Sequence, residues 1–255
     1  MAALAAVGLA AATVLLPAAD PAQAATTLYG MQTERVSGGS YTVQSNEFNS
    51  SASECVSVDG EADFSVSSSS VNAPANGMPA GYPSIYSGCH WGDCTETGIG
   101  KNPVRVSSLN YSTVETTWEF TGPWSSGGSW DASYDVWINK TPNASAPNGV
   151  ELMVRLRQSG SISPAGSKVV SNVSITGNTY DIWWNPPSGS STGTVTYQMV
   201  NQENAVRNFS LQPLALNAIA RGYTSSSWYL ADIEAGFEIW HGGAGLRTAD
   251  FSVNG

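Results

Sequence analysis

Short stretches of alternating apolar and polar residues recur along most of the chain, as in half-buried β-strands. Clusters of glycine, proline, asparagine and serine separate them, which is typical of turns. We expect strands at residues 40–44, 55–58, 63–66, 104–106, 114–120, 133–138, 150–156, 168–170, 173–175, 180–184, 194–200, 228–240 and 251–253. Many short strands at this spacing predict an all-β fold, a single-domain sandwich of two antiparallel sheets.

One segment has helical rather than strand character. It runs from Leu211 to Arg221, with Ser210 before it as a candidate N-cap and Pro213 in its first turn. Gly222 follows as a stop signal. We therefore expect one short α-helix beside the sheets.

The composition narrows the classes of protein further. Charged residues make up 12% of the chain and apolar residues 41%, including nine tryptophans, so a coiled coil and a disordered chain are both excluded. Ten basic and 20 acidic residues give a net charge of −10, and the basic residues do not cluster. Nucleic acid and other polyanions are therefore poor partners, whereas a neutral ligand fits.

The N-terminal segment indicates the compartment. Residues 1–19 are almost wholly apolar, and the small-x-small tripeptide Ala22-Gln23-Ala24 follows. This pattern predicts a secretory signal peptide over residues 1–24, although an alanine-rich helix is the alternative. The mature domain would span residues 25–255 and be extracellular, and no later apolar run predicts a membrane span.

The cysteines fit an oxidising environment. Cys89 and Cys94 enclose a short, turn-rich loop, and we favour a disulfide between them. A metal site made of Cys89, His90 and Cys94 is the rival, but the only other histidine is His241 and no fourth ligand is evident. Cys55 is left over, and we expect it to be a buried small apolar residue.

Two of the expected strands place glutamates among apolar neighbours. In residues 150–157 the period of two puts Val150, Leu152, Val154 and Leu156 on the core face, and Glu151, Met153, Arg155 and Arg157 opposite. In residues 232–240 it puts Ile233, Ala235, Phe237 and Ile239 on the core face, and Asp232, Glu234, Gly236, Glu238 and Trp240 opposite. Residues 133–139 likewise set Asp135, Trp137 and Asn139 apart from the core residues Tyr134, Val136 and Ile138.

Acids and aromatic rings on one sheet face suit the chemistry of glycans. Sugar C–H faces stack on aromatic rings, and cleavage of a glycosidic bond uses two carboxyl groups. Gly236 would leave space for a close approach beside Glu238. The plain alternative is that these glutamates lie on a solvated face and that about half of the tryptophans are ordinary packing residues.

Four motifs resemble glycoside hydrolase family 12. They are Glu151-Leu152-Met153-Val154, Gly236-Phe237-Glu238-Ile239-Trp240, Ser133-Tyr134-Asp135-Val136-Trp137 and Gly88-Cys89-His90-Trp91-Gly92-Asp93-Cys94, in the family's order and spacing. The resemblance covers essentially the whole mature chain and is greatest to secreted actinobacterial endoglucanases.

The resemblance implies a β-jelly roll with a concave substrate cleft and a secreted retaining endo-β-1,4-glucanase without metal or organic cofactor. It implies that Glu151 is the nucleophile, that Glu238 is the general acid/base and that Asp135 holds the nucleophile. Retention implies carboxyl groups about 5–5.5 Å apart. The residues proposed to bind the β-glucan are Asn46, Phe48, His90, Trp91, Trp137, Met153 and Trp240. We expect a monomer.

Three positions depart from the family's pattern. Arg155 stands where the family usually has tryptophan, Phe48 replaces a tryptophan that stacks on a sugar, and Leu28-Tyr29 stands where a cysteine would bridge to Cys55. Glu234 shares a face with Glu238, and we expect it at a distal subsite or in solvent.

Two alternatives to a cellulase stay open from the sequence. The preferred substrate could be xyloglucan or mixed-linkage β-glucan, because cleft width and loops decide this choice. A jelly roll of this kind could also be a non-catalytic carbohydrate-binding protein. A laminarinase-like enzyme is excluded because Asp232 to Glu238 lacks the required order of acids on one strand.

Overall fold

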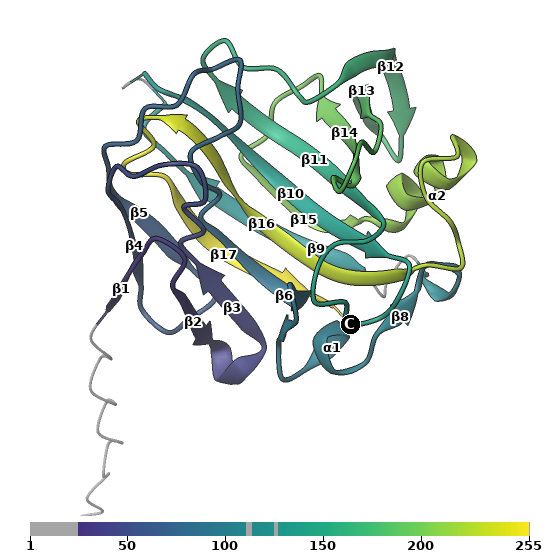
Figure 1. The fold of residues 1–255 in the computed structure, drawn as a ribbon, viewed down its shortest axis with the longest axis horizontal. Helices are drawn as coiled ribbons and strands as arrows, with labels where there is room; N and C mark the ends of the chain where they lie inside the picture. Colours follow the sequence, from purple (N-terminus) through teal and green to yellow (C-terminus); the bar gives the residue numbers. More distant parts are fainter. Residues whose placement is uncertain (1–24, 111–113, 125–126, 255) are drawn as a thin grey trace, which may run out of the picture.

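The chain folds as a sandwich of two β-sheets (Figure 1). The computed structural model describes residues 25–110, 114–124 and 127–254, so the expected signal peptide lies outside the described residues. The smaller sheet contains, in spatial order, β1 (Thr26–Tyr29), β4 (Glu54–Val58), β5 (Phe64–Ser69), β17 (Arg247–Val253), β9 (Glu115–Thr121) and β15 (Ala205–Ser210).

The larger sheet carries the long central strands. Its order is β12 (Ser167–Ile175), β13 (Asn178–Asn185), β14 (Gly193–Met199), β11 (Val150–Ser159), β10 (Ser129–Asn139), β16 (Tyr229–His241), β6 (Ser84–His90), β3 (Tyr41–Gln44) and β2 (Thr33–Val36). Two short strands extend it, β7 (Asp93–Cys94) beside β6 and β8 (Val104–Arg105) beside β16. The expected two-sheet all-β fold is thus confirmed.

One pairing departs from the expected antiparallel order. β14 lies parallel to β11, because the chain leaves β11, forms the antiparallel strands β12, β13 and β14, and returns to the free edge of β11. Glu151 of β11 is in register with Thr194 of β14. This parallel pairing brings the Thr194 hydroxyl, which is distant in sequence, beside Glu151.

The expectation of a single helix is also corrected. The expected helix is α2 (Gln212–Ala220), and the structure adds the one-turn helix α1 (Gly98–Lys101) and two 3₁₀ turns, Ser37–Gly39 and Val106–Ser108. The cap of α2 is Leu211 rather than Ser210. Gly222 has φ of 78° and its N–H bonds to the Ile219 carbonyl, as the stop signal predicts.

An aromatic cluster fills the space between the sheets. Trp118 of β9 and Phe237 of β16 are fully buried with ring centroids 5.8 Å apart. Phe64 and Phe120 lie 5.9 Å from Phe237 on the smaller-sheet side. The predicted core faces of β10, β11 and β16 are all buried, which confirms the alternation read from the sequence.

Cys55 is partly exposed rather than buried, so that expectation is wrong. It lies on the outward face of β4, opposite Tyr29 of β1, while its neighbours Glu54 and Val56 point inward. No helix in the described part of the chain is long and apolar enough to cross a membrane.

Phe237→Ala should lower the free energy of unfolding by about 3–5 kcal/mol, because it leaves a cavity within the aromatic cluster. The matched control is Phe48→Ala, whose ring is 44% exposed and whose loss should change stability by less than about 0.5 kcal/mol. Urea unfolding of both variants measures the difference. Equal losses would contradict this account of the core.

Candidate active site

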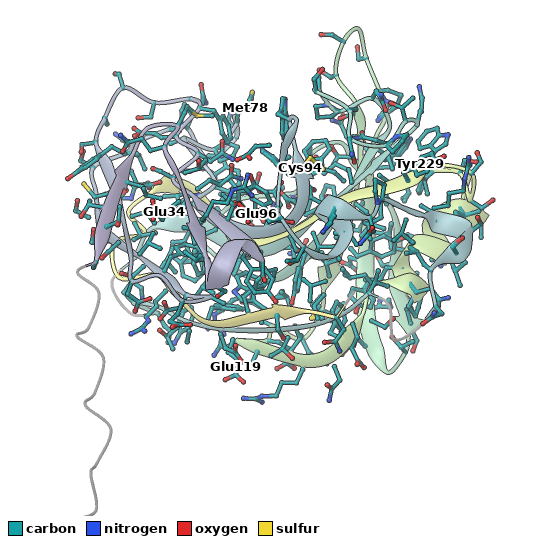
Figure 2. All side chains as sticks on the ribbon, turned by 90° about the horizontal axis from the view of Figure 1, so that it is seen from below. Glu34, Met78, Cys94, Glu96, Glu119 and Tyr229 are labelled. Carbon is teal, nitrogen blue, oxygen red and sulfur yellow. A yellow bond between two sulfur atoms is a disulfide. The ribbon has the colours of Figure 1, made fainter. Side chains whose placement is uncertain are left out.

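An open cleft of about 1420 Å³ runs across the face of the larger sheet that is turned away from the core. All ten residues proposed for catalysis or binding line it: Asn46, Phe48, His90, Trp91, Asp135, Trp137, Glu151, Met153, Glu238 and Trp240. Figure 2 shows Met78, at the cleft, and Glu119, on β9, on opposite sides of the sandwich.

Strand register gathers the cleft's acids on adjacent strands. Asp135 of β10 lies between Met153 of β11 and Glu234 of β16. Two residues along β10, Trp137 lies between Glu151 and Asp232. Because residues in register share a sheet face, the three strands form one acidic floor.

Glu151 is held as an acceptor of hydrogen bonds. The Thr194 hydroxyl donates to its Oε2 over 2.8 Å, and Asp135 also bonds to it. Burial raises the pKa of Glu151, and these two bonds oppose the rise. Burial and the charge of Glu151 raise the pKa of Asp135 well above its usual range, so Asp135 is protonated and donates to Glu151.

Glu238 has different partners. It lies in register with Asp131 of β10, which is fully buried. Burial and the Asp131 charge raise the pKa of Glu238 well above its usual range, although Arg155 acts against the rise. Arg155 Nη2 lies 2.6 Å from Asp131 Oδ2 and 3.2 Å from Glu238 Oε2. Glu238 is therefore the carboxyl group suited to carry a proton.

A β-bulge in β11 corrects the expected position of Arg157. The pairing with β10 shifts between Ala132 and Ser133, so Arg155 faces Ser133 but Arg157 faces the core residue Ala132. Arg157 consequently leaves the cleft face and packs its guanidinium 4.4 Å from the ring centre of Trp124. An extra residue in one strand reverses the facing of the residues after it, and simple alternation does not predict such a reversal.

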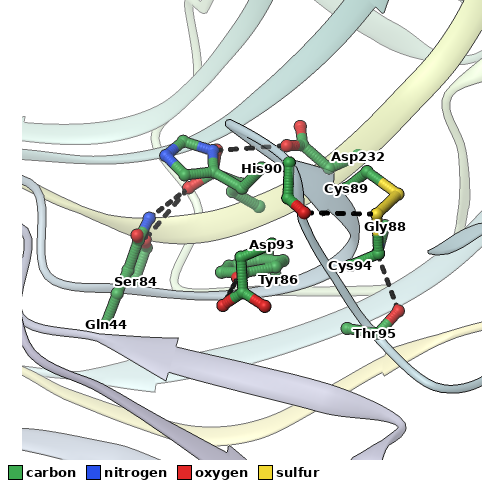
Figure 3. A network of polar contacts seen from close by, with 12 residues as sticks. Gln44, Ser84, Tyr86, Gly88, Cys89, His90, Asp93, Cys94, Thr95 and Asp232 are labelled. Carbon is green, nitrogen blue, oxygen red and sulfur yellow. Dashed lines mark hydrogen bonds and ion pairs between the residues drawn. A yellow bond between two sulfur atoms is a disulfide. The ribbon is translucent and has the colours of Figure 1, made fainter. Parts of the chain in front are cut away.

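Glu234 is 1% exposed and lines the cleft, so the solvent alternative is wrong, and a subsite distant from Glu238 stays a prediction. His90 Nδ1 lies 2.6 Å from its Oε1, while the Gln44 amide and the Ser84 hydroxyl donate to its Oε2 over 2.8 and 3.1 Å. Asp232 Oδ2 lies 3.3 Å from the same histidine nitrogen (Figure 3).

These contacts set the charge of His90. Burial lowers its pKa, but the charges of Glu234 and Asp232 and their hydrogen bonds outweigh burial and raise the pKa to about 10. Burial and the Glu234 charge raise the pKa of Asp232 to about 7. Protonated His90 thus neutralises acidic charge on the side of the cleft formed by β6.

The hairpin between β6 and β7 presents an aromatic ring to the cleft. The Cys89–Cys94 disulfide closes it, so the expected bridge is confirmed and the two sulfurs are not metal ligands. Trp91 and Gly92 form its turn with φ of 45° and 87°. Trp91 is 49% exposed, with ring centroids 3.9 Å from His90 and 5.2 Å from Trp137.

Gly236 does not leave space for a ligand, contrary to the sequence interpretation. A Cβ atom there would lie 2.4 Å from the Pro83 carbonyl oxygen and 2.5 Å from Ser84 Cβ. The glycine instead allows the start of β6 to approach β16 closely. Trp240 is 3% exposed, and its indole N–H donates to the Gly77 carbonyl over 2.8 Å.

His90, Asp232 and Glu234 could also be considered as cation ligands, since their ligand atoms lie within 4.8 Å of one another. In the structure, however, the histidine nitrogen is at hydrogen-bonding distance from both carboxylates, which accounts for the cluster as an ion-pair network.

Sequence reasoning missed the residues that support the acids. Thr194, Gln44 and Ser84 are polar strand residues with no local sequence signal, and they reach the acids through long-range pairing. Asp131 was also missed as a partner of Arg155. Its position two residues before Ser133 on a strand with alternating faces is the one signal that could have indicated it.

The family model described as glycosyl hydrolase family 12 matches residues 39–254. The chain is 33% identical over 157 residues to a probable cellulase, Cel12b, of Mycobacterium tuberculosis, an alignment that covers 62% of this chain and 94% of that protein.

Solved structures have the same fold. Endoglucanase Cel12A from Rhodothermus marinus superposes with a TM-score of 0.81 and 35% identity, over 90% of this chain and 98% of that one. A family 12 xyloglucanase from Bacillus licheniformis superposes with a TM-score of 0.77 at 19% identity, over 91% and 99% of the two chains, which shows the fold alone. These similarities confirm the jelly-roll architecture.

His90→Gln should flatten the pH dependence of stability. Folded His90 keeps its proton up to about pH 10, whereas the unfolded residue loses it near 6.5. The stability due to His90 is thus complete below pH 6.5 and declines as pH rises towards 10, by at most about 1.4 kcal/mol per pH unit. Urea unfolding at pH 7.5, 8.5 and 9.5 measures this slope.

The exposed His241 provides the matched control, and His241→Gln should keep the wild-type slope. An unchanged slope in His90→Gln would contradict the assignment of a protonated His90 between the two acids.

Proposed function

The chain belongs to glycosyl hydrolase family 12, and from that premise we propose that it is a secreted, retaining endo-β-1,4-glucanase in which Glu151 and Glu238 carry the reaction. It is a glycoside hydrolase with cellulase relatives. The observation that carries the finer proposal is that both glutamates line one cleft, where hydrogen bonds oppose the rise in the pKa of Glu151 and the pKa of Glu238 is raised well above its usual range.

Glu151 acts as the nucleophile. The donors Thr194 and Asp135 favour the ionised form of Glu151, and this carboxylate attacks the anomeric carbon. The bond formed is a glycosyl ester, and the leaving oxygen departs from the same carbon. Asp135, which stays protonated, orients the carboxylate without competing for the sugar.

Glu238 acts first as acid and then as base. Its raised pKa keeps a proton that passes to the leaving oxygen as the glycosidic bond breaks. The resulting carboxylate then removes a proton from the water that hydrolyses the glycosyl ester. Two successive inversions at one carbon give retention, which requires carboxyl groups about 5–5.5 Å apart.

The rest of the cleft suits an uncharged glucan chain. Trp91 and Phe48 expose 49% and 44% of their surfaces at the cleft and can stack on sugar rings. Asn46, Trp137, Met153, Trp240 and protonated His90 supply further contacts to hydroxyl groups and apolar faces. A net charge of −10 disfavours anionic polysaccharides.

Export is part of the proposal. It is supported by the apolar segment that ends at Ala22-Gln23-Ala24 and by the Cys89–Cys94 disulfide, which persists in oxidising compartments. Residues 25–255 would then form the extracellular catalytic domain.

Release of reducing sugar from amorphous cellulose, barley β-glucan, xyloglucan and xylan tests the function. We expect the wild type to release sugar from the first two substrates, because they contain β-1,4-linked glucose without sugar side chains. Glu151→Ala should release none. A marked preference for xyloglucan or for mixed-linkage glucan would assign the narrower specificity. Binding of glucan without release from any substrate would contradict the enzyme proposal and favour a carbohydrate-binding protein.

Chemical rescue tests the two roles separately. Glu151→Ala should lose activity on the order of 10⁴-fold or more while retaining oligosaccharide binding, and azide should restore turnover of an aryl β-cellobioside with a product of inverted configuration. Glu238→Ala should lose about 10²–10⁴-fold on polysaccharide but little in the first step with a good leaving group, since it then needs no acid. Wild-type turnover by Glu151→Ala would rule out this assignment.

A further inference from the structure

Arg155 is a buried cation in the floor of the cleft, at a position where the resemblance predicts tryptophan. Its side chain is 2% exposed and lies between two carboxyl groups, 2.6 Å from Asp131 and 3.2 Å from Glu238. Its Nη1 also lies 3.4 Å from the Gln158 amide oxygen. The proposed function does not by itself require a cation here.

The two carboxyl groups around Arg155 differ in access to the cleft. The side chain of Asp131 is wholly buried and does not line the cleft, whereas that of Glu238 is 17% exposed and does. The two residues are in register across β10 and β16, and Arg155 Nη2 lies within 3.2 Å of an oxygen of each carboxyl group. Two negative charges that share one cation and are largely shielded from water repel each other strongly, so the pair holds one proton.

The position of Arg155 decides where that proton lies. A guanidinium stabilises most the negative charge that it contacts most closely, and the closer oxygen belongs to Asp131. We propose that Arg155 is a positioning residue for the general acid: by pairing with Asp131 it keeps the negative charge there and the shared proton on Glu238, facing the substrate. This inference deepens the proposed function and rests on Glu238 being the acid.

Other charged groups also act on the pair. Asp135 of β10 and Glu151 of β11 face Glu238 from the cleft floor, and Glu234 lies further along β16. Burial and the Asp131 charge raise the pKa of Glu238, and Arg155 lowers it. Loss of Arg155 should therefore raise the pKa of the pair further, and loss of the Asp131 charge should lower that of Glu238.

The first experiment records kcat/KM on barley β-glucan against pH. Arg155→Met should move the alkaline limb to higher pH by about one to three pH units, Asp131→Asn should move it to lower pH, and the double variant should lie between them. Arg155→Lys should return the limb towards the wild-type position. Arg157→Met is the matched control, because it removes the same charge two residues along but off the cleft, and its limb should not move.

The second readout is dependence on the leaving group. If the proton shifts to Asp131 in Arg155→Met, kcat/KM at the plateau should fall at least about tenfold more on β-glucan than on 2,4-dinitrophenyl β-cellobioside, which needs no acid. A merely structural role would lower both equally and leave the limb in place. That result would overturn the proposal.

A third measurement does not require activity. Titration of ¹³C-labelled carboxyl groups by NMR in the full chain, with Glu238→Gln assigning the Glu238 signal, should show Glu238 protonated in the wild type at pH values below the alkaline limb. In Arg155→Met the Glu238 signal should shift towards its ionised position at the same pH, because part of the proton then lies on Asp131, and in Arg157→Met it should not shift. If the wild type cleaves no glucan and Arg155→Met still shows this shift, the proposed function is refuted and the Arg155 inference stands. If Arg155→Met does not fold, the Glu238 titration is compared instead between Asp131→Asn and the double variant. The same Glu238 pKa in these two variants would overturn the inference.

Discussion

Desolvation of carboxyl groups is the constraint on which the rest of the site depends. The register of β10, β11 and β16 places six acids on one sheet face. Four of them are buried, Asp131, Asp135, Asp232 and Glu234, and the other two, Glu151 and Glu238, are only partly exposed in the cleft. A buried carboxylate without a partner is costly, so each must gain a donor, a cation or a proton. The distribution of those partners gives chemically similar side chains different roles.

The fold supplies each partner through a different long-range feature. The parallel return of β14 brings the Thr194 hydroxyl to Glu151, and the disulfide-closed hairpin after β6 brings His90 to Glu234. The bulge in β11 leaves Arg155 in the floor of the cleft and removes Arg157 from it. The scaffold therefore tunes proton affinities as well as distances, since each partner is fixed by main-chain pairing.

Alternation along single strands was enough to predict the core faces and the acids opposite them, and the resemblance to the family added Asn46, Phe48, His90 and Trp91. Alternation failed where structure depends on partners far along the chain. β6 was not expected because it is covered on both faces and does not alternate, and Arg157 was misplaced because the bulge breaks the period. Solvent exposure, one of the two positions expected for Glu234, was wrong, because its partner Gln44 is 190 residues away in sequence.

Mass spectrometric mapping of a trapped glycosyl-enzyme tests the division of roles most directly. A 2-deoxy-2-fluoro-β-cellobioside with an activated leaving group slows hydrolysis of the covalent ester, so the intermediate accumulates and the attached residue can be identified after proteolysis. The account predicts a single cellobiosyl adduct on Glu151. An adduct on Glu238 or Asp135, or steady turnover of other substrates with no adduct from this reagent, would contradict it.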